Sequence, residues 1–465
     1  CQRAGLPDDV MQFVVVEDGP LGQQLVTDER VELVVLTGAA ETAELFRSWR
    51  PSLPLLAETS GKNALVVTPS ADLDLAAADL AASAFGHAGQ KCSAASLGIL
   101  VGSVATSRRF RNQLLDAVRS LRVAWPTTPA AQMGPLTEPP GEKLLRGLTE
   151  LEPGQEWLLE PKRLDTRLWR PGIRIGVQPG SEFHQVEYFG PVLGLMAADS
   201  LDEAIAWQNG TEFGLTAGLH SLDPEEIAHW VDRVEAGNVY VNRSITGAIV
   251  QRQPFGGWKR SAVGPGTKAG GPNYLAAFGT YRLSSVPEER GNVSRDLPLP
   301  TEGDAAEFRV GHDPSALLAE RNQLRYLPTD VTVRVEGAPQ SHVRHEAMAA
   351  LLVGAKPRFS FREAPEPRFA RALREAGCAV EVMPDERFDA GVRGRVRHLG
   401  ARDLLADVGG SIDVTVYAGD PLPGRLAFLP YVREQAVSVT MHRFGHPTSL
   451  DVPAAKHPGT GGMAH

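Results

Sequence analysis

Cysteine is scarce in this sequence, with only Cys1, Cys92 and Cys378 among 465 residues. The three lie far apart and none belongs to a CxxC pair, which argues against a disulfide framework and a zinc site, so no metal site is predicted. No apolar run approaches the roughly 20 residues that a membrane-spanning helix needs. The 47 basic residues are outnumbered by 56 acidic ones, so the chain lacks the basic surface typical of nucleic-acid-binding proteins. These absences favour a cytoplasmic protein with neither a membrane span nor a nucleic-acid partner.

What is present is an alternation of short β-branched runs with helical stretches, which predicts an α/β fold with parallel strands. Strands are predicted in QFVVVEDG (12–19) and VELVVLTG (31–38), with a helix between them. Another helix ends just before Cys92, and a further one spans about 107–121. The Pro-rich residues 125–175 are expected to be irregular. Strand, helix, strand, helix and strand then follow from EYFGPVLGLMAA to AGNVYVNRS.

A polar stretch at 285–304 predicts a linker to a second α/β unit at 305–450, where strand and helix patterns again alternate. No glycine-rich phosphate loop opens any helix of this unit, so we expect a dinucleotide-domain-like fold without the binding chemistry. The segment HVRHE (342–346) places two histidines and a glutamate within one helical turn, but it spells neither zinc motif, and a solvated helix start is expected. The tail at 451–465 is expected to be disordered.

Cys92 lies in FGHAGQKCSAASLG, among small residues that leave a thiol accessible. A lone cysteine is more often a buried small hydrophobe than a nucleophile. A nucleophilic cysteine also needs a base and donors for the oxyanion that it creates. Glu58 is the candidate base, because it ends a predicted strand and active-site groups of parallel sheets gather at the carboxyl ends of strands. A lone glutamate is also consistent with a solvated surface charge, so both interpretations stay open on these residues alone.

Five motifs occur in a fixed order along the chain: LTGAAETA (36–43), AETSGKN (57–63), GQKCSA (89–94), EYFGPV (187–192) and PFGGWKRS (254–261). Their order and approximate spacing resemble those of the aldehyde dehydrogenase superfamily. Serine directly after the cysteine, together with KAGGPNYL, is similar to the L-glutamate-γ-semialdehyde (1-pyrroline-5-carboxylate) dehydrogenases of proline catabolism. The unit at 305–450 is similar to the C-terminal aldehyde-dehydrogenase-like domain of bacterial and actinobacterial proline utilization A proteins.

The resemblance implies NAD-dependent oxidation of L-glutamate γ-semialdehyde to L-glutamate. Cys92 is implied to attack the aldehyde carbonyl and to carry a thiohemiacetal and then a thioester, while Glu58 activates the hydrolytic water. Glu187 would hold the nicotinamide ribose, and Phe189 would place the ring. The implied cofactor-binding residues are Gly38, Thr59, Ser60, Gly61, Glu187 and Phe189. The implied substrate-binding residues are Ser93, Phe255, and Gly270 and Gly271, whose backbone amides would hold the substrate α-carboxylate.

The resemblance also implies a domain organisation. CQRAGLP is similar to the middle of the family's NAD-binding domain, so the chain is expected to be the C-terminal part of a longer enzyme and inactive alone. A homo-oligomer is expected, with fusion to or partnership with a proline dehydrogenase domain. The implied segments are 1–62 as a partial Rossmann-like NAD domain, 63–260 as the catalytic domain, 261–290 as the substrate-anchor loop and return segment, 291–304 as the linker, 305–450 as the C-terminal aldehyde-dehydrogenase-like domain, and 451–465 as the tail.

Alternatives remain for each assignment. Phe189 and Phe255 are also consistent with core aromatics, and Gly270 with Gly271 is consistent with a simple bend. A different carboxylated aldehyde is a second candidate substrate, whereas coenzyme A as acyl acceptor conflicts with Glu58 as a hydrolytic base. The alternative from a different class of function is a non-catalytic fragment that takes part in the assembly of a bifunctional proline-oxidising protein. For the C-terminal unit we favour a structural role, as a lid over the aldehyde site or as a substitute for a partner subunit.

Overall fold

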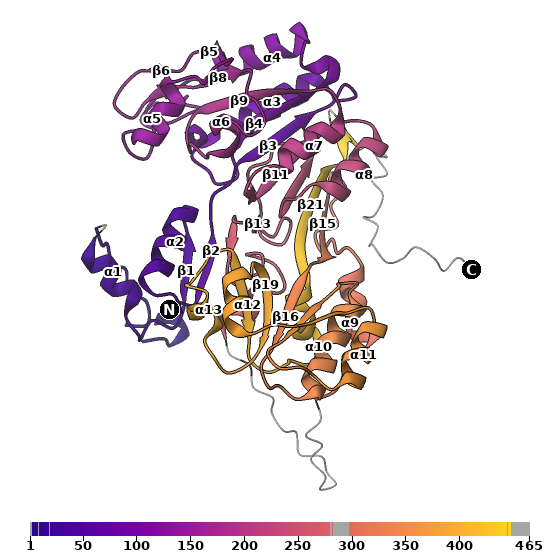
Figure 1. Ribbon diagram of the computed structural model, residues 1–465. Coiled ribbons are helices and arrows are strands. Elements are labelled where there is room, and N and C mark those ends of the chain that lie inside the picture. The colour runs from indigo at the N-terminus through magenta and orange to yellow at the C-terminus, as the bar shows by residue number, and fades with distance from the viewer. Residues whose placement is uncertain are drawn as a thin grey trace.

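The computed structural model describes residues 2–7, 9–17, 19–279, 281, 297–443 and 445–447. The predicted tail at 451–465 lies outside these residues, as do 282–290 of the predicted return segment and 291–296 of the predicted linker. Besides short two-stranded pairs, the described residues form a nine-stranded, a five-stranded and a three-stranded sheet with helices packed against them (Figure 1). The predicted α/β class is therefore confirmed.

The N-terminal region forms two helices and a three-stranded sheet: α1 (Pro20–Thr27), β1 (Val34–Thr37), α2 (Ala40–Trp49), β2 (Leu55–Glu58) and, from later in the chain, β14 (Ala262–Val263). β1 and β2 are parallel, so their carboxyl ends meet at one edge, and β14 pairs antiparallel with β2. The strand predicted at 12–19 is wrong. Residues 12–17 have no regular structure and Phe13 is 93% exposed, because no described strand pairs with them to satisfy a ladder of hydrogen bonds.

The largest sheet is built from nine strands: β3 (Asn63–Val67), β4 (Ala95–Val101), β5 (Glu156–Leu159), β8 (Gly172–Ile175), β9 (Val192–Ala198), β11 (Thr216–His220), β12 (Asn238–Val241), β15 (Glu320–Pro328) and β21 (Val432–Thr440). Their order is β15-β21-β12-β11-β3-β4-β9-β8-β5, and only the two edge strands are antiparallel to their neighbours. Every residue of β3 is buried, which agrees with its continuous apolar run. The main helices that connect these strands are α3 (Leu73–Phe85), α4 (Arg108–Arg119), α7 (Leu201–Asn209) and α8 (Pro224–Arg233).

The segment 125–175, predicted to be irregular, supplies two strands of this sheet. β8 pairs parallel with β9, and β5 forms the edge beyond it. The prediction is wrong because β5 and β8 have only four residues each and lie between prolines, and four residues are too few for a period to show. The remaining elements of this region are α5 (Glu142–Thr149), β6 (Lys162–Arg163), β7 (Trp169–Arg170) and α6 (Glu182–Gln185).

Two strands of the predicted C-terminal unit, β15 and β21, belong to the nine-stranded sheet. β21 pairs parallel with β12, with Asn238 opposite Ala436, and β15 pairs antiparallel along the whole of β21. Figure 1 shows β21, in yellow, beside β15 and extending into the region of β11. The pairing covers the edge of β12, which would otherwise present unpaired backbone groups. The C-terminal unit is thus joined to the predicted catalytic domain by a continuous sheet.

The rest of the C-terminal unit is a parallel sheet with helices between its strands: β16 (Val331–Val335), α10 (Gln340–Leu352), β17 (Arg358–Phe361), α11 (Pro367–Glu375), β18 (Ala379–Val382), α12 (Asp385–Gly391), β19 (Gly394–Leu399), α13 (Leu404–Asp407) and β20 (Val414–Ala418). Its order is β18-β17-β16-β19-β20, so the chain reverses direction across the sheet between β16 and β19. In doubly wound folds this switch point is where a dinucleotide binds. The remaining short elements are β10 (Phe213–Gly214), β13 (Trp258–Lys259), α9 (Glu302–Ala305), β22 (His442–Arg443) and β23 (His446–Pro447).

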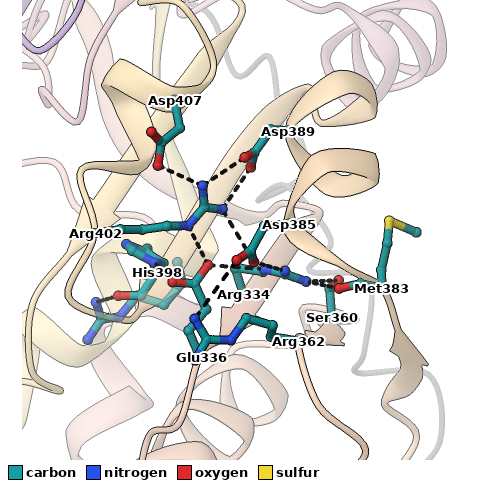
Figure 2. A network of polar contacts seen from close by, with 11 residues as sticks. Arg334, Glu336, Ser360, Arg362, Met383, Asp385, Asp389, His398, Arg402 and Asp407 are labelled. Atoms are coloured by element: carbon teal, nitrogen blue, oxygen red, sulfur yellow. Dashed lines mark hydrogen bonds and ion pairs between the residues drawn. The ribbon is translucent and has the colours of Figure 1, made fainter.

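Charged side chains occupy the switch point of the C-terminal sheet (Figure 2). Glu336, which follows β16 and has a side chain that is 3% exposed, accepts a hydrogen bond from Arg402 Nε at 2.7 Å and lies 3.3 Å from Arg334 Nε. His398 Nε2 lies 3.1 Å from the other carboxylate oxygen. Burial acts to raise the pKa of Glu336, but the hydrogen bonds and charges of Arg402 and His398 together outweigh it, and the pKa is lowered. In doubly wound folds this position binds a dinucleotide, whereas charged side chains of the protein itself occupy it in this sheet.

Replacing Glu336 with alanine is expected to destabilise the C-terminal unit by about 1–3 kcal/mol, because Arg334, Arg402 and His398 would all lose the buried carboxylate that they share, while Arg334 keeps Asp385. The measurement is the urea midpoint of unfolding, with amide hydrogen exchange in β16 and β19 showing where stability is lost. The matched control is Glu386→Ala, which removes an exposed carboxylate from α12 and should change stability by less than about 0.5 kcal/mol. Equal midpoints for the two variants would contradict the assignment of a buried ion network.

The HVRHE segment starts α10, but its expected solvation is wrong at two positions. His345 is fully buried and Glu346 is 2% exposed. Glu346 accepts hydrogen bonds from Arg397 Nε at 2.8 Å and from Tyr431 Oη at 2.6 Å. These partners come from β19 and from the segment before β21, so the sequence around HVRHE gives no sign of them.

The longest helices in the described part of the chain, α3 and α10, have 13 residues each, and no described helix has the length and apolar character for crossing a bilayer. Within the same residues, His, Cys, Asp and Glu form no group of three or more suited to a metal ion.

Candidate active site

Cys92 and Glu58, predicted as nucleophile and base, come together from separate segments. Glu58 ends β2, and Cys92 lies in the loop between α3 and β4. The Cys92 Sγ–H points to Glu58 Oε1 at 3.9 Å, within the range of a weak thiol hydrogen bond. Both side chains are partly exposed, so a small molecule has access to them. A thiol and a carboxylate arranged in this way can pass a proton when an electrophile reaches the sulfur.

The loop that carries Cys92 is held in an unusual backbone conformation. His87, Ala88 and Gly89 follow α3 and have φ values of 56°, 56° and 69°. Two successive non-glycine residues in the left-handed region are disfavoured, and such strain persists only where surrounding contacts impose it. Asn63 supplies one such contact, since its Nδ2 donates to Cys92 O at 2.7 Å and to a second carbonyl of the loop at 2.9 Å. The position of the Cys92 backbone is therefore fixed from β3.

The environment of the pair determines where its protons reside. Burial, together with the charges of Glu58 and Glu187, raises the pKa of the Cys92 thiol to about 11. Burial also raises the pKa of Glu58, while the charge of Lys268 lowers it. At neutral pH the thiol is protonated, and a carboxylate with a raised pKa is a better acceptor for its proton.

Three of the predicted cofactor-binding residues gather beside the cysteine loop. Gly61 N donates to Glu187 Oε1 at 3.0 Å. Burial raises the pKa of Glu187, and the hydrogen bond from Gly61 opposes that effect. Phe189 has a φ of 54° and is 41% exposed, so its ring is displayed at the surface. A Cβ on Gly89 would lie 2.2 Å from Gly190 O, so only glycine lets the cysteine loop approach the EYFGPV segment this closely.

The other predicted cofactor-binding residues lie around the carboxyl end of β2. Gly38 N donates to Glu58 O at 3.2 Å, which places Gly38 between β1 and α2. Thr59 and Ser60 are buried and bind Ser261, through Thr59 N to Ser261 O at 3.1 Å and through Ser261 Oγ to Ser60 O at 2.6 Å. In the structure these two residues therefore join β2 to the PFGGWKRS segment.

The chemistry of these residues fits a nicotinamide dinucleotide. The Glu187 carboxylate can accept hydrogen bonds from two sugar hydroxyls, and the exposed ring of Phe189 lies two residues away. The ten-residue helix α2 has Ala39 at its N-cap, which offers no side-chain oxygen to the first amides of the helix. The first amide of the helix, Ala40 N, donates to Ser60 Oγ at 3.4 Å, and a helix N-terminus suits a phosphate group.

The predicted substrate-binding segments meet in a second part of the site. Phe255 and Ala269 exchange backbone hydrogen bonds at 2.9 and 2.7 Å, which pairs the PFGG segment with KAGG. Glu58, Phe255 and Lys268 line one cavity of about 150 Å³. Gly270 and Gly271 follow in the same loop; Gly270 has a φ of 73°, while Gly271 N donates to Lys268 O at 3.0 Å and is engaged within the loop.

Ser93 is buried beside Cys92, and its carbonyl accepts a hydrogen bond from Thr216 Oγ1 at 3.2 Å. Among the described residues, neither Ser93 nor the pair Gly270 and Gly271 lines the cavity that contains Glu58. Glu58 and Phe255 thus line one cavity. Ser93 follows Cys92 in the chain and contacts β11 through Thr216.

The sequence analysis missed two buried lysines. Lys62 is 3% exposed, its Nζ lies 4.2 Å from the centre of the Phe183 ring, and burial lowers its pKa to about 7. Lys268 is equally buried, donates to Asn238 Oδ1 at 2.9 Å, and has a pKa lowered by burial to about 7. Both lie within quoted motifs, but a lysine is usually exposed, and nothing in the sequence marks these two as buried.

The sheet, the strand-end glutamate and the cysteine loop together form the candidate active site of an α/β fold. Residues 1–282 match the aldehyde dehydrogenase family, and the chain belongs to that family. The predicted aldehyde dehydrogenase fold is thereby confirmed.

Individual family members with known names or solved structures are similar to this chain. The chain is 32% identical to a 1-pyrroline-5-carboxylate dehydrogenase from Geobacillus sp. (strain WCH70) over 285 residues, which cover 59% of this chain and 55% of the relative. It is 43% identical to proline utilization A (PutA) from Corynebacterium freiburgense, with a TM-score of 0.80 over 96% of this chain and 45% of that one. A 1-pyrroline-5-carboxylate dehydrogenase from Thermus with bound NAD is 32% identical, with a TM-score of 0.51 over 56% of this chain and 51% of that one. The chain thus spans about half the length of these relatives.

Proposed function

We propose that the intact protein carrying this chain oxidises L-glutamate γ-semialdehyde to L-glutamate with NAD⁺ as the electron acceptor. The observation that carries this proposal is the Cys92 thiol at 3.9 Å from the Glu58 carboxylate, in a member of the aldehyde dehydrogenase family. The substrate is proposed from the relatives named 1-pyrroline-5-carboxylate dehydrogenase and proline utilization A, the latter 43% identical.

Cys92 and Glu58 would carry the covalent steps. The Cys92 sulfur bonds to the aldehyde carbon while the thiol proton passes through Glu58 to the carbonyl oxygen, giving a thiohemiacetal. Loss of a hydride from that carbon and of the hydroxyl proton to solvent then leaves a thioester. Glu58 then takes a proton from water, whose oxygen attacks the thioester carbon. The carbon–sulfur bond breaks, glutamate leaves, and Cys92 is restored.

NAD⁺, when bound, accepts the hydride. We propose that Glu187 holds the nicotinamide ribose, that Phe189 orients the ring, and that Gly38 with Thr59, Ser60 and Gly61 shapes the approach to α2. Phe255, Ser93 and the loop containing Gly270 and Gly271 are proposed to hold the substrate. Since Gly271 N is engaged with Lys268 O, the Gly270 amide is the better candidate for the α-carboxylate.

We further propose that the protein is a cytoplasmic homo-oligomer, fused to or partnered with a proline dehydrogenase domain. A catalytic thiol needs a reducing compartment, and glutamate γ-semialdehyde is the species that proline oxidation supplies after ring hydrolysis.

The test is NADH formation by the intact protein with glutamate γ-semialdehyde, compared with an uncharged aldehyde of the same chain length. A higher kcat/KM for the carboxylated substrate, with release of free glutamate, is the expected result. Oxidation of the uncharged aldehyde alone would overturn the proposed substrate, and formation of a coenzyme A thioester in place of glutamate would overturn the hydrolytic role of Glu58.

A further inference from the structure

Glu434, on β21 of the C-terminal unit, binds both segments that form the predicted substrate side of the site. Its backbone carbonyl accepts a hydrogen bond from Trp258 Nε1 at 2.8 Å. One carboxylate oxygen accepts from Lys268 N at 2.8 Å, and the other accepts from Asn273 Nδ2 at 2.6 Å. Glu434 is 7% exposed, so both hydrogen bonds are shielded from water. Buried hydrogen bonds to a charged acceptor are stronger than neutral ones.

The two donors of the carboxylate flank the predicted anchor for the substrate. Lys268 and Asn273 lie on either side of Gly270 and Gly271, so a single side chain fastens both ends of this short loop. Between the two points the loop turns through Gly270, which has a φ of 73°. A glycine-containing loop has many accessible conformations when free, and two fixed ends select among them.

Tyr326 on β15 extends the same contact. It lies directly opposite Glu434 in the β15–β21 pairing, and it is 1% exposed. Its hydroxyl accepts a hydrogen bond from Asn273 Nδ2 at 3.0 Å and another from Arg425 Nη2 at 3.1 Å. The Asn273 side chain is therefore held by two neighbouring strands, both from the C-terminal unit.

The carboxylate of Glu434 also acts electrostatically on the ammonium group of Lys268. Lys268 has a buried ammonium group that donates to Asn238 Oδ1 at 2.9 Å and to Gly256 O. Burial lowers the pKa of Lys268, and the charge of Glu434 opposes that effect. Lys268, Glu434 and Glu58 line the same cavity, so this arrangement borders the predicted base.

We propose that Glu434 is a positioning residue that fixes the loop at 268–273 in the shape that receives the substrate's α-carboxylate. The C-terminal unit thereby determines specificity for a carboxylated aldehyde without contributing a group that touches the reacting atoms. This inference rests on the proposed function, because it assumes that the loop binds a carboxylate.

The test compares Glu434→Gln with the wild type in the intact protein. Glutamine keeps the size of the side chain but removes the charge and replaces one acceptor by a donor, which faces either Lys268 N or Asn273 Nδ2. We expect kcat/KM for glutamate γ-semialdehyde to fall on the order of 10- to 100-fold, chiefly through KM. The KM values for NAD⁺ and for an uncharged aldehyde of the same length should stay at their wild-type values.

Two further variants keep the test decisive. Tyr326→Phe removes only the hydroxyl that accepts from Asn273, so it should raise the same KM by a smaller factor and serves if Glu434→Gln does not fold. Glu386→Gln, which neutralises an exposed carboxylate on α12, should match the wild type throughout.

The outcomes separate this inference from the proposed function. A wild-type protein that does not oxidise glutamate γ-semialdehyde refutes the proposed function itself. An active wild type whose KM for that substrate is unchanged in both Glu434→Gln and Tyr326→Phe refutes the positioning role. Equal losses for the carboxylated and the uncharged aldehyde would also refute it, because they indicate general damage to the fold.

Discussion

Replacing Cys92 with alanine is expected to lower kcat for aldehyde oxidation by about 10⁴- to 10⁶-fold, the size of loss seen when an enzyme's nucleophile is removed. The structure gives the reason, since Cys92 is the partly exposed thiol that faces a carboxylate, at 3.9 Å from Glu58 Oε1. Alanine offers no atom that can bond to the aldehyde carbon, which leaves only slow hydride loss from the hydrated aldehyde. The measurement is steady-state NADH formation by the intact protein.

The matched control is Cys378→Ala. Cys378 is 4% exposed in the core of the C-terminal unit, and burial raises the pKa of its thiol, so it is neither accessible nor reactive. This variant should keep the wild-type kcat and should have a slightly lower unfolding midpoint, because buried packing is lost. NADH binding by the Cys92→Ala protein, followed by fluorescence, shows whether the site remains folded. Substantial turnover in a Cys92→Ala protein that binds NADH would refute the role of this cysteine.

The fold of the chain was predictable where local patterns are long and regular. From Val331 to Ala418 each strand of the C-terminal parallel sheet coincides with a segment that has a strand pattern, and the longer helices α10 and α11 coincide with segments that have a helix pattern. The same is true of β9, α7, β11, α8 and β12 in the catalytic part. In these regions the hydrophobic period, the strand length and the turn residues all indicate the same structure, and such agreement makes prediction from sequence reliable.

Pairing between distant segments was not predictable in the same way. β15 and β21 have ordinary strand patterns, but nothing in them shows that they join β12 rather than the sheet formed by the residues between them. The residues 12–17 show the opposite case, since Phe13 and its β-branched neighbours have strand-forming composition but no described partner. Strand propensity reflects packing against neighbours, and the neighbours are specified by the whole fold.

The distinction between local patterns and contacts across the chain applies to the candidate active site as well. The motifs were sufficient to single out Cys92 and Glu58, because each chemistry-bearing residue lies within a short recognisable segment. Asn63, which holds the cysteine loop, and Glu434, which holds the loop at 268–273, act through hydrogen bonds across 29 and up to 166 residues of sequence. An asparagine and a glutamate on strands give no local sign of such roles, and only the burial and the partners seen in the structure reveal them.

Replacing Glu58 with glutamine is expected to separate the two halves of the proposed reaction. Glutamine fills the same space and can still accept a hydrogen bond from Cys92, but it cannot take a proton from water. The thioester should therefore form and then hydrolyse slowly, with steady-state turnover lower by about 10²- to 10⁴-fold. Glutamine also cannot accept the Cys92 proton during attack, but removing the Glu58 charge relieves one of the effects that raise the pKa of Cys92, so the thiolate forms more readily and hydrolysis is expected to remain the slower step.

Rapid mixing tests this directly, because the variant should release a burst of about one NADH per Cys92 and then turn over slowly. Glu187→Gln provides the contrast, since a defect in holding the ribose slows hydride transfer itself and should abolish the burst.

The pH profile of kcat gives an independent check of the role of Glu58. Glu58 acts as a base only when deprotonated, and burial raises its pKa, so wild-type kcat should fall as the pH drops through that raised value. This fall of kcat at low pH should disappear in Glu58→Gln. If the variant shows no burst and keeps the same fall of kcat at low pH, Glu58 is not the base that activates water.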